Sequence, residues 1–537
     1  MRITSLRHAA VWVACLSHHV AAVKHRNPAE GAARKNAYEI FNAIHSAMRQ
    51  WGSSLNHNGL STFVATVPAG VTLYHGTWRT APPPGPEWLA FEIEHAEMFA
   101  HARMRFPPPA PNTTDSFIKL QRQRGIFFQG QSDYQARNDD EDDDTEGHLQ
   151  LYRTTKPIRL LYIDGMSAGN TEMGTLDFQD FVLRGDRHAD VWDELDRAKS
   201  LCDVVTGWGL QGVIRMEAGF EIIQCDFSDS LELVSVTQRP SEPRGGLGWE
   251  GYSEVHPIEF VRAVAQRYHG IGASRVALDF SSMVSAMFYP VALSNENMSN
   301  PSLPRLRHAT DEELHVIRAR VEEVVYERLD GKQSSINWQE VADLIVGRYA
   351  DRIWFMAERA QFTLEILGEL NHLTNTHVDY GAEKDGYRAA LSRCERHYLS
   401  SVTPRTPEDR LILAAMEEVT HAICERLYAV RLYIEHELGY KYNYTAPAAH
   451  EDKVLHASKR SIKHLMENLK WTRWKECTTC GFHEVCFVPM WPFGDKDSYE
   501  QPNCRDLSSI TNGWWENRYW DMPKMRHSVK PPSKEDL

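Results

Sequence analysis

The chain has 537 residues, which is too long for one compact core, so two or three domains are expected. A hydrophobic content of 42% and a charged content of 25% are ordinary for a soluble globular protein. The formal net charge of −14 argues against a nucleic-acid partner, because a phosphate-binding surface needs clustered Lys and Arg side chains.

The first 22 residues have the pattern of a signal peptide. A basic start at 1–8 precedes a short apolar run at 9–16, and Val20-Ala21-Ala22 offers small residues for cleavage. We therefore expect the protein to be secreted. No other stretch approaches about 18 consecutive apolar residues, so no membrane span is expected.

The cysteine count agrees with secretion. Of nine cysteines, Cys15 would leave with the signal peptide, and the remaining eight suit an oxidising compartment and up to four disulfides. Three Asn-x-Ser/Thr sequons, at Asn112, Asn297 and Asn443, are compatible with a secreted glycoprotein.

Residues 30–238 predict an α+β domain. Helical spacing at 30–55 comes first, and further helices are expected at 93–105 and 189–206. Short apolar runs separated by polar and Pro-rich loops predict six strands, at 62–67, 71–75, 158–163, 212–216, 220–227 and 231–237.

A Pro- and Gly-rich segment at 239–255 predicts a linker, and the pattern changes after it. Apolar residues with a 3.6-residue period predict a helical domain over 256–473, with helices at 311–329, 338–359, 362–373, 387–399, 408–438 and 452–471. Residues 474–537 form a Cys- and Trp-rich tail with little regular pattern, whose Trp491 and Trp514-Trp515 are expected to pack onto the helices.

Two short segments carry the most informative polar residues. The first strand-like run ends in His75-Gly76-Thr77, and the later run 212–223 places Glu221 at the start of an apolar strand. If these strands lie side by side, an imidazole and a carboxylate face one crevice. Between them come Trp88-Leu89-Ala90-Phe91, then the segment 95–100 and the strand 158–163.

These segments resemble the His-Tyr-Glu branch of the ADP-ribosyltransferase-like proteins over roughly residues 70–235. The resemblance implies a split-sheet α+β fold and transfer or hydrolysis of ADP-ribose, with NAD as the substrate and no metal. The acceptor would be an unknown protein or small molecule. The chain as a whole resembles uncharacterised secreted proteins of filamentous fungi.

The resemblance also implies roles for single residues. Glu221 would orient the ribose and stabilise an oxocarbenium-like state, and His75 would hydrogen-bond the ribose while Gly76 lets the backbone approach closely. Thr77 belongs to the same binding element. The aromatic residues that would flank the nicotinamide are Phe91 and Phe99.

Both phenylalanines stand where the family usually has a Tyr, which keeps stacking and puts a hydrogen bond from that ring in doubt. The competing structural interpretation makes His75 a turn residue and Glu221 a solvent-facing strand residue. A non-catalytic secreted protein with a structural or host-facing role is a further alternative.

A serine hydrolase is the other enzymatic alternative. Gly165-Met166-Ser167-Ala168-Gly169 directly follows the strand 158–163, as in a nucleophile elbow, so Ser167 would attack with His188, His256 or His269 as base. The elbow should feed a helix, yet 170–176 contains Gly174 and no helical stripe, which favours an ordinary turn.

The tail contains a spacing that zinc sites use. Cys477, Cys480, His483 and Cys486 could bind Zn²⁺. Because the N-terminus predicts secretion, disulfides that include Cys504 are favoured over a metal.

Overall fold

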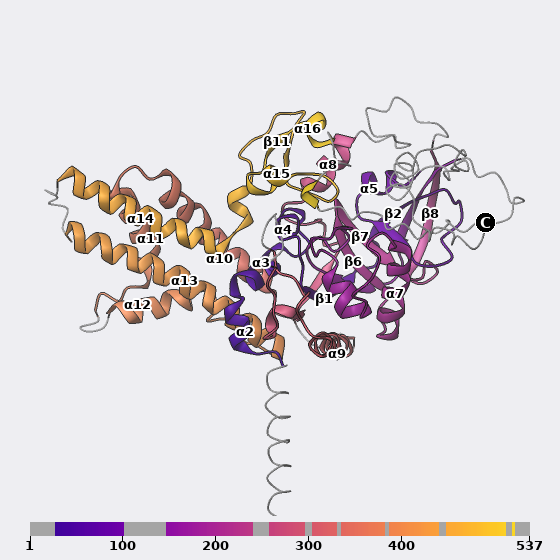
Figure 1. Cartoon of the computed structure of the whole chain (residues 1–537), viewed down its shortest axis with the longest axis horizontal. Helices are drawn as coiled ribbons and strands as arrows, with labels where there is room; N and C mark the ends of the chain where they lie inside the picture. Colours follow the sequence, from indigo (N-terminus) through magenta and orange to yellow (C-terminus); the bar gives the residue numbers. More distant parts are fainter. Residues whose placement is uncertain are drawn as a thin grey trace, which may run out of the picture.

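The computed structural model describes residues 27–100, 146–239, 257–295, 303–329, 335–381, 386–439, 447–511 and 518–520. The predicted signal peptide, the three sequons, Trp514-Trp515 and nearly all of the predicted linker lie outside these ranges. The described part is a mixed α/β body built on one curled sheet, with a helical arm extending from one side (Figure 1).

Three short helices replace the single helix predicted over 30–55: α2 (Glu30–Lys35), α3 (Ala37–Ser46) and α4 (Gln50–Leu55). The chain breaks after α3, where Met48 takes a left-handed φ of 55°. The apolar face of α3, with Ile40, Phe41 and Ile44, is fully buried in the main core.

The sheet has nine strands in the order β8-β4-β2-β3-β7-β6-β5-β1-β9. Only the β5–β6 pair is parallel. The strands are β1 (Ser61–Val67), β2 (Thr72–Thr77), β3 (Glu87–Ala90), β4 (His148–Thr154), β5 (Ile158–Ile163), β6 (Gly212–Glu217), β7 (Gly219–Gln224), β8 (Leu231–Gln238) and β9 (Ala277–Ser285).

The central strands match the apolar runs of the sequence because they are buried on both faces. The edge strand β8 is largely exposed. Two strands, β3 and β4, were not predicted, and β9 lies inside the range predicted to be a helical domain. β9 forms because β1, more than 200 residues earlier, supplies its hydrogen-bonding partner.

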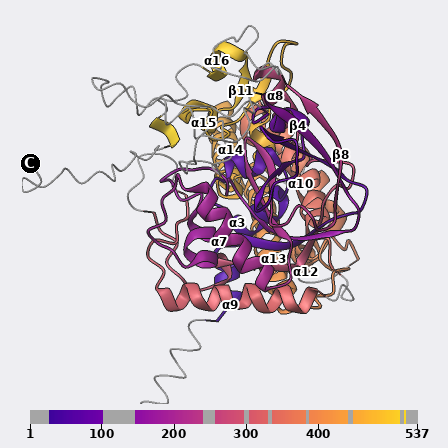
Figure 2. The ribbon, with the colours of Figure 1, turned by 90° about the vertical axis from the view of Figure 1, so that its right-hand side faces the viewer.

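Helices and short helical turns cover the sheet. They are α5 (Ile93–Glu97), the π-helix η2 (Phe178–Arg184), α7 (Glu194–Gly207), α8 (Pro257–Ala265), the 3₁₀ turn η3 (Ala286–Phe288) and α9 (Asp311–Arg328). Asp193 caps α7, and Thr310 with Glu313 forms a capping box at α9. Figure 2 shows α9 running across the bottom of the body.

The arm contains the long helices that the sequence predicted. It comprises α10 (Trp338–Trp354) continued by η4 (Phe355–Arg359), α11 (Thr363–Thr374) continued by η5 (Asn375–His377), α12 (Gly386–Glu395), α13 (Pro407–Leu438) and α14 (Ala448–Leu469). α13 reaches from the arm to the body, where it packs on α2 and α3. One hydrophobic core therefore runs from the sheet into the arm.

The tail consists of short elements packed beside α8 (Figure 1). They are η6 (Thr472–Lys475), β10 (Val485–Phe487), α15 (Lys496–Glu500), β11 (Asn503–Arg505), α16 (Leu507–Thr511) and η8 (Arg518–Trp520). Trp491 is buried here, and the tail forms one small core with α8.

Four disulfides connect the eight cysteines expected in the mature chain: Cys202–Cys225, Cys394–Cys424, Cys477–Cys486 and Cys480–Cys504. Four bonds are compatible with a secreted or extracellular protein. Within the described ranges, no helix combines the length and apolarity that a membrane crossing requires.

Asp164 directly follows β5 and is buried, and its Oδ1 accepts a hydrogen bond from Ser61 N at 2.7 Å. Burial raises the pKa of Asp164 to about 7 from 3.8. Between these pH values the folded protein keeps a proton that the unfolded chain has released, so the free energy of unfolding falls as pH rises.

Asp164→Asn keeps the acceptor oxygen and cannot ionise. We expect the stability of the natural chain relative to this variant to fall by roughly 2–4 kcal/mol between pH 4 and 8. Urea unfolding of both proteins across this range checks it. The prediction concerns the difference in the free energy of unfolding between the two proteins. Buried histidines such as His57, whose pKa is lowered, make each protein more stable as pH rises, and this effect cancels in the difference. Parallel stability curves would contradict the prediction.

Candidate functional site

The main candidate site is a cavity of about 110 Å³ that is partly open to solvent, called here the His75–Glu221 cavity. Its walls come from β2, β3, α5, β6, β7, the start of α7 and the tail. The lining residues are Tyr74, His75, Gly76, Glu87, Trp88, Leu89, Ala90, His95, Ala96, Phe99, Ala168, Asn170, Glu194, Arg215, Glu217, Glu221 and Trp491.

The structure brings His75 and Glu221 to the same cavity, although their strands are not adjacent. β3 lies between them, with Ala90 paired to Tyr74 on one side and to Glu221 on the other. Both predicted residues line the cavity, with β3 between them, but it is Tyr74 and not His75 that is in register with Ala90 and Glu221.

His75 is held in one orientation. Its Nδ1 lies 2.7 Å from the carbonyl oxygen of Trp88, and because a carbonyl can only accept, Nδ1 carries the proton. Burial lowers the pKa of His75 to about 4, with the hydrogen bond to Trp88 acting in the other direction. The ring is neutral at physiological pH, and its Nε2 is an acceptor.

Glu221 forms a buried ion pair with Arg215, its direct partner across the β6–β7 hairpin. Arg215 donates from Nη2 to Glu221 Oε1 at 2.7 Å and from Nε to the same oxygen at 3.2 Å. Arg215 also donates to Glu194 Oε2 at 2.9 Å. Burial alone would lower the pKa of Arg215, but these two carboxylates outweigh burial and raise it.

Glu217 and His95 stand beside this pair. His95 Nε2 lies 3.6 Å from Glu217 Oε1, and one ligand atom from each of His95, Glu217 and Glu221 lies within 4.8 Å of the others. Burial raises the pKa of Glu217 to about 7, and the charge of Glu221 adds to this effect. Gly219, with φ of 108°, makes room: a Cβ there would lie 2.8 Å from His95 Nδ1.

The predicted cofactor-binding residues separate into two groups. Gly76 and Phe99 line the cavity. Phe91 is instead buried in the main core with the Arg275 guanidinium 5.8 Å from its ring centroid, and the Thr77 hydroxyl accepts a hydrogen bond from Arg79 N. The close approach at Gly76 is made by the α5 backbone, because a Cβ there would lie 2.0 Å from Ala96 O.

The residues of the two alternative sites, the serine nucleophile and the zinc ligands, do not have the arrangement that those activities need. Ser167 is buried and donates its hydroxyl to the Ile163 carbonyl at 2.9 Å. Cys477, Cys480 and Cys486 are all in disulfides, as the sequence favoured, so their sulfurs are not thiolates.

The sequence did not point to most of the other cavity residues, among them Arg215, Glu217, His95 and Trp491. A signal existed for the first two, because Gly219 marks a tight hairpin turn that places Arg215 opposite Glu221 and Glu217 on the same face. No local signal identifies Trp491, which reaches the cavity from the tail.

Almost all of the cavity lies in the part of the chain that matches a known family model. Residues 29–244 match the family model described as the YPL277C N-terminal domain, a range that includes every lining residue except Trp491. Two Saccharomyces cerevisiae proteins are similar to this chain. "Uncharacterized protein YOR389W" is 24% identical over 85% of this chain and 82% of that protein.

The second yeast protein, "Uncharacterized protein YPL277C", is 31% identical over 38% of this chain and 43% of that protein. No solved structure matches the chain. These findings support a fungal family, and the names of the relatives state no activity. Function is therefore argued from the cavity.

Proposed function

We propose that the His75–Glu221 cavity binds the nicotinamide riboside end of NAD and cleaves the bond between nicotinamide and ribose. The ADP-ribosyl group then passes to water or to an acceptor. The observation that carries this proposal is the convergence of His75 and Glu221, from strands far apart in the sequence, on one cavity.

The charge of the cavity supports a cationic substrate end. Four glutamates, Glu87, Glu194, Glu217 and Glu221, are among its lining residues, together with Arg215. The nicotinamide ring of NAD is positively charged, and positive charge moves to the ribose as the bond breaks. Carboxylates held in place before the reaction stabilise that charge.

Aromatic side chains supply surfaces for the nicotinamide ring. Trp88, Phe99 and Trp491 line the cavity from three different parts of the chain. A cation over an aromatic face is stabilised by about 0.5–2 kcal/mol. The cavity is partly open to solvent, and the ADP half of NAD would extend through this opening.

The chemistry needs few groups. The bond from ribose C1′ to the nicotinamide nitrogen breaks, and its electron pair leaves with nicotinamide, which becomes neutral. Glu221, oriented by Arg215, stabilises the resulting oxocarbenium-like ribose, and His75 Nε2 accepts a hydrogen bond from a ribose hydroxyl. A water or acceptor hydroxyl attacks C1′ and loses its proton to solvent.

The test is release of nicotinamide from NAD by the purified, oxidised protein in the presence of a chelator, followed by chromatography. We expect His75→Ala to lower kcat/KM roughly tenfold to a hundredfold, the effect of losing one buried hydrogen bond. His45→Ala is the matched control, because His45 is also a buried histidine whose pKa burial lowers to about 4, but it lies outside the cavity.

Failure of the natural chain to bind or cleave NAD would overturn the proposal. Equal losses in His75→Ala and His45→Ala would show that the histidine acts only through the fold. Labelling of Ser167 by a fluorophosphonate, abolished in Ser167→Ala, would instead favour the serine hydrolase.

A further inference from the structure

Three side chains of the cavity converge without satisfying one another. His95 is 3% exposed, its Nδ1 has no hydrogen-bond partner among the described residues, and its Nε2 is 3.6 Å from Glu217 Oε1, beyond a normal hydrogen bond. Both Arg215 hydrogen bonds to Glu221 end on Oε1, which leaves Oε2 to face other partners. Buried polar groups of this kind are normally paired or coordinate a metal.

The ion pairs around the cavity contain fewer positive than negative groups. The connected network contains three guanidiniums, of Arg184, Arg197 and Arg215. Four carboxylates, of Asp180, Glu194, Asp196 and Glu221, pair with them, and the carboxylate of Glu217, which lies beside His95, adds a fifth. With all of these groups ionised, two negative charges remain, which is the charge that one divalent cation balances.

We propose that His95, Glu217 and Glu221 form a binding site for a divalent transition metal. The three residues come from α5, the end of β6 and β7, so the fold and not a local motif assembles the site. Their ligand atoms already lie within 4.8 Å of one another. The adjoining open cavity provides space for water or substrate at the remaining coordination positions.

The donor set indicates which metal. One imidazole and two carboxylates suit Zn²⁺ and its neighbours, whereas Mg²⁺ and Ca²⁺ prefer ligands that are all oxygen. Zn²⁺ is therefore the expected ion, and Co²⁺, which accepts the same ligands and absorbs visible light, is its spectroscopic substitute.

This inference does not depend on NAD cleavage, although both use Glu221. The two are separated by measuring metal binding directly, without NAD, and by measuring NAD cleavage in chelator. A negative result in one measurement then does not change the interpretation of the other.

The experiment is a calorimetric titration of the full, oxidised chain with Zn²⁺, paired with Co²⁺ absorption spectra. No reductant is added, because reduced cysteines of the tail would bind zinc themselves. We expect one Zn²⁺ per chain at micromolar concentration, a visible Co²⁺ band, and loss of both in Glu217→Gln and in His95→Gln. Circular dichroism and thermal melting of each variant verify that it is folded.

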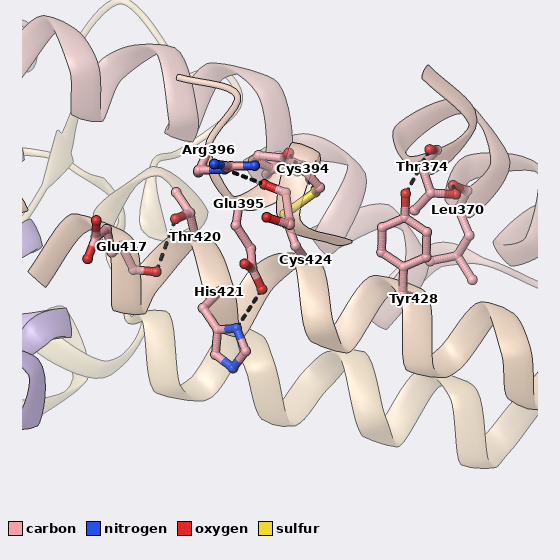
Figure 3. The surroundings of a disulfide bond; sticks show 12 residues. Leu370, Thr374, Cys394, Glu395, Arg396, Glu417, Thr420, His421, Cys424 and Tyr428 are labelled. Atoms are coloured by element: carbon pink, nitrogen blue, oxygen red, sulfur yellow. Dashed lines mark hydrogen bonds and ion pairs between the residues drawn. A yellow bond between two sulfur atoms is a disulfide. The ribbon is translucent and has the colours of Figure 1, made fainter. Parts of the chain in front are cut away.

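His421→Gln is the matched control. His421 Nδ1 lies 2.6 Å from Glu395 Oε1 on the arm, so this pair also combines an imidazole with a carboxylate but is not part of the cavity (Figure 3). Binding should be unchanged in this variant.

Several results would overturn the site. They are absence of Zn²⁺ binding to the natural chain, binding that survives in a folded Glu217→Gln variant, and binding lost in His421→Gln. Displacement of Zn²⁺ by equal concentrations of Mg²⁺ or Ca²⁺ would contradict the assigned class of metal.

Discussion

Glu221→Gln should lower the rate of nicotinamide release from NAD by about 100- to 1000-fold and leave the protein folded. Glutamine keeps the shape of the side chain and removes the charge that faces the oxocarbenium-like ribose. Loss of one preorganised electrostatic contact of this kind costs roughly 3–4 kcal/mol of transition-state stabilisation. The measurement is single-turnover cleavage at saturating NAD, which reports the chemical step.

Glu87→Gln separates the specific role of Glu221 from the general charge of the cavity. Glu87 lines the same cavity from β3 and loses the same charge on substitution. We expect only a small change in its cleavage rate. Equal losses in the two variants would mean that cavity charge alone matters, and full activity in Glu221→Gln would contradict the assigned chemistry.

Arg215→Met should destabilise the protein by roughly 3–5 kcal/mol, one of the largest losses expected for a single substitution. Arg215 is 1% exposed and binds both Glu194 and Glu221. Methionine fills much of the volume but leaves these two carboxylates with one cation fewer. Breaking a buried ion pair by removing one partner has a cost of this size.

Arg153→Met is the control for the loss of an arginine ion pair at the surface. Arg153 Nη2 lies 2.8 Å from Glu232 Oε2, and both side chains are about half exposed. An exposed pair contributes at most about 1 kcal/mol. Urea unfolding at pH 7 compares the variants, and a loss below 1 kcal/mol in Arg215→Met would contradict the buried network.

The restoring variant Arg215→Met with Glu221→Gln extends this prediction. It removes one of the two carboxylates that Arg215→Met leaves uncompensated, so part of the lost stability should return. Coupling between neighbouring members of one network is commonly 0.5–3 kcal/mol. Simple addition of the two single effects would show that the pair does not interact.

Local patterns predicted the long helices after residue 310 well, because the apolar period that identifies a helix is local. The 3.6-residue apolar period over 311–329 and 408–438 corresponds to α9 and α13 with small changes at the ends. The even number of cysteines likewise indicated up to four disulfides, and four are present. Each of these inferences needs only neighbouring residues or a count.

Strands were harder, because a strand is stabilised by a partner that can lie anywhere in the chain. β5 was predicted with its observed bounds from a continuous apolar run. The short β3 and the late β9 carry weaker runs, and their identity depends on β7 and β1, which hydrogen-bond to them. The predicted separation into an α+β part and a helical part is therefore crossed by β9.

The sequence by itself determined that this protein has a mixed α/β part, a helical part and paired cysteines, and it pointed to His75 and Glu221 as a pair. The tertiary structure decided what surrounds that pair: β3 between the two strands, Arg215 on Glu221, His95 and Glu217 beside it, and Trp491 from the tail. The physical reason is the distance along the chain over which each signal acts. Periodicity and composition act over a few residues, whereas a cavity exists only after strands and a tail from distant parts of the chain have packed together.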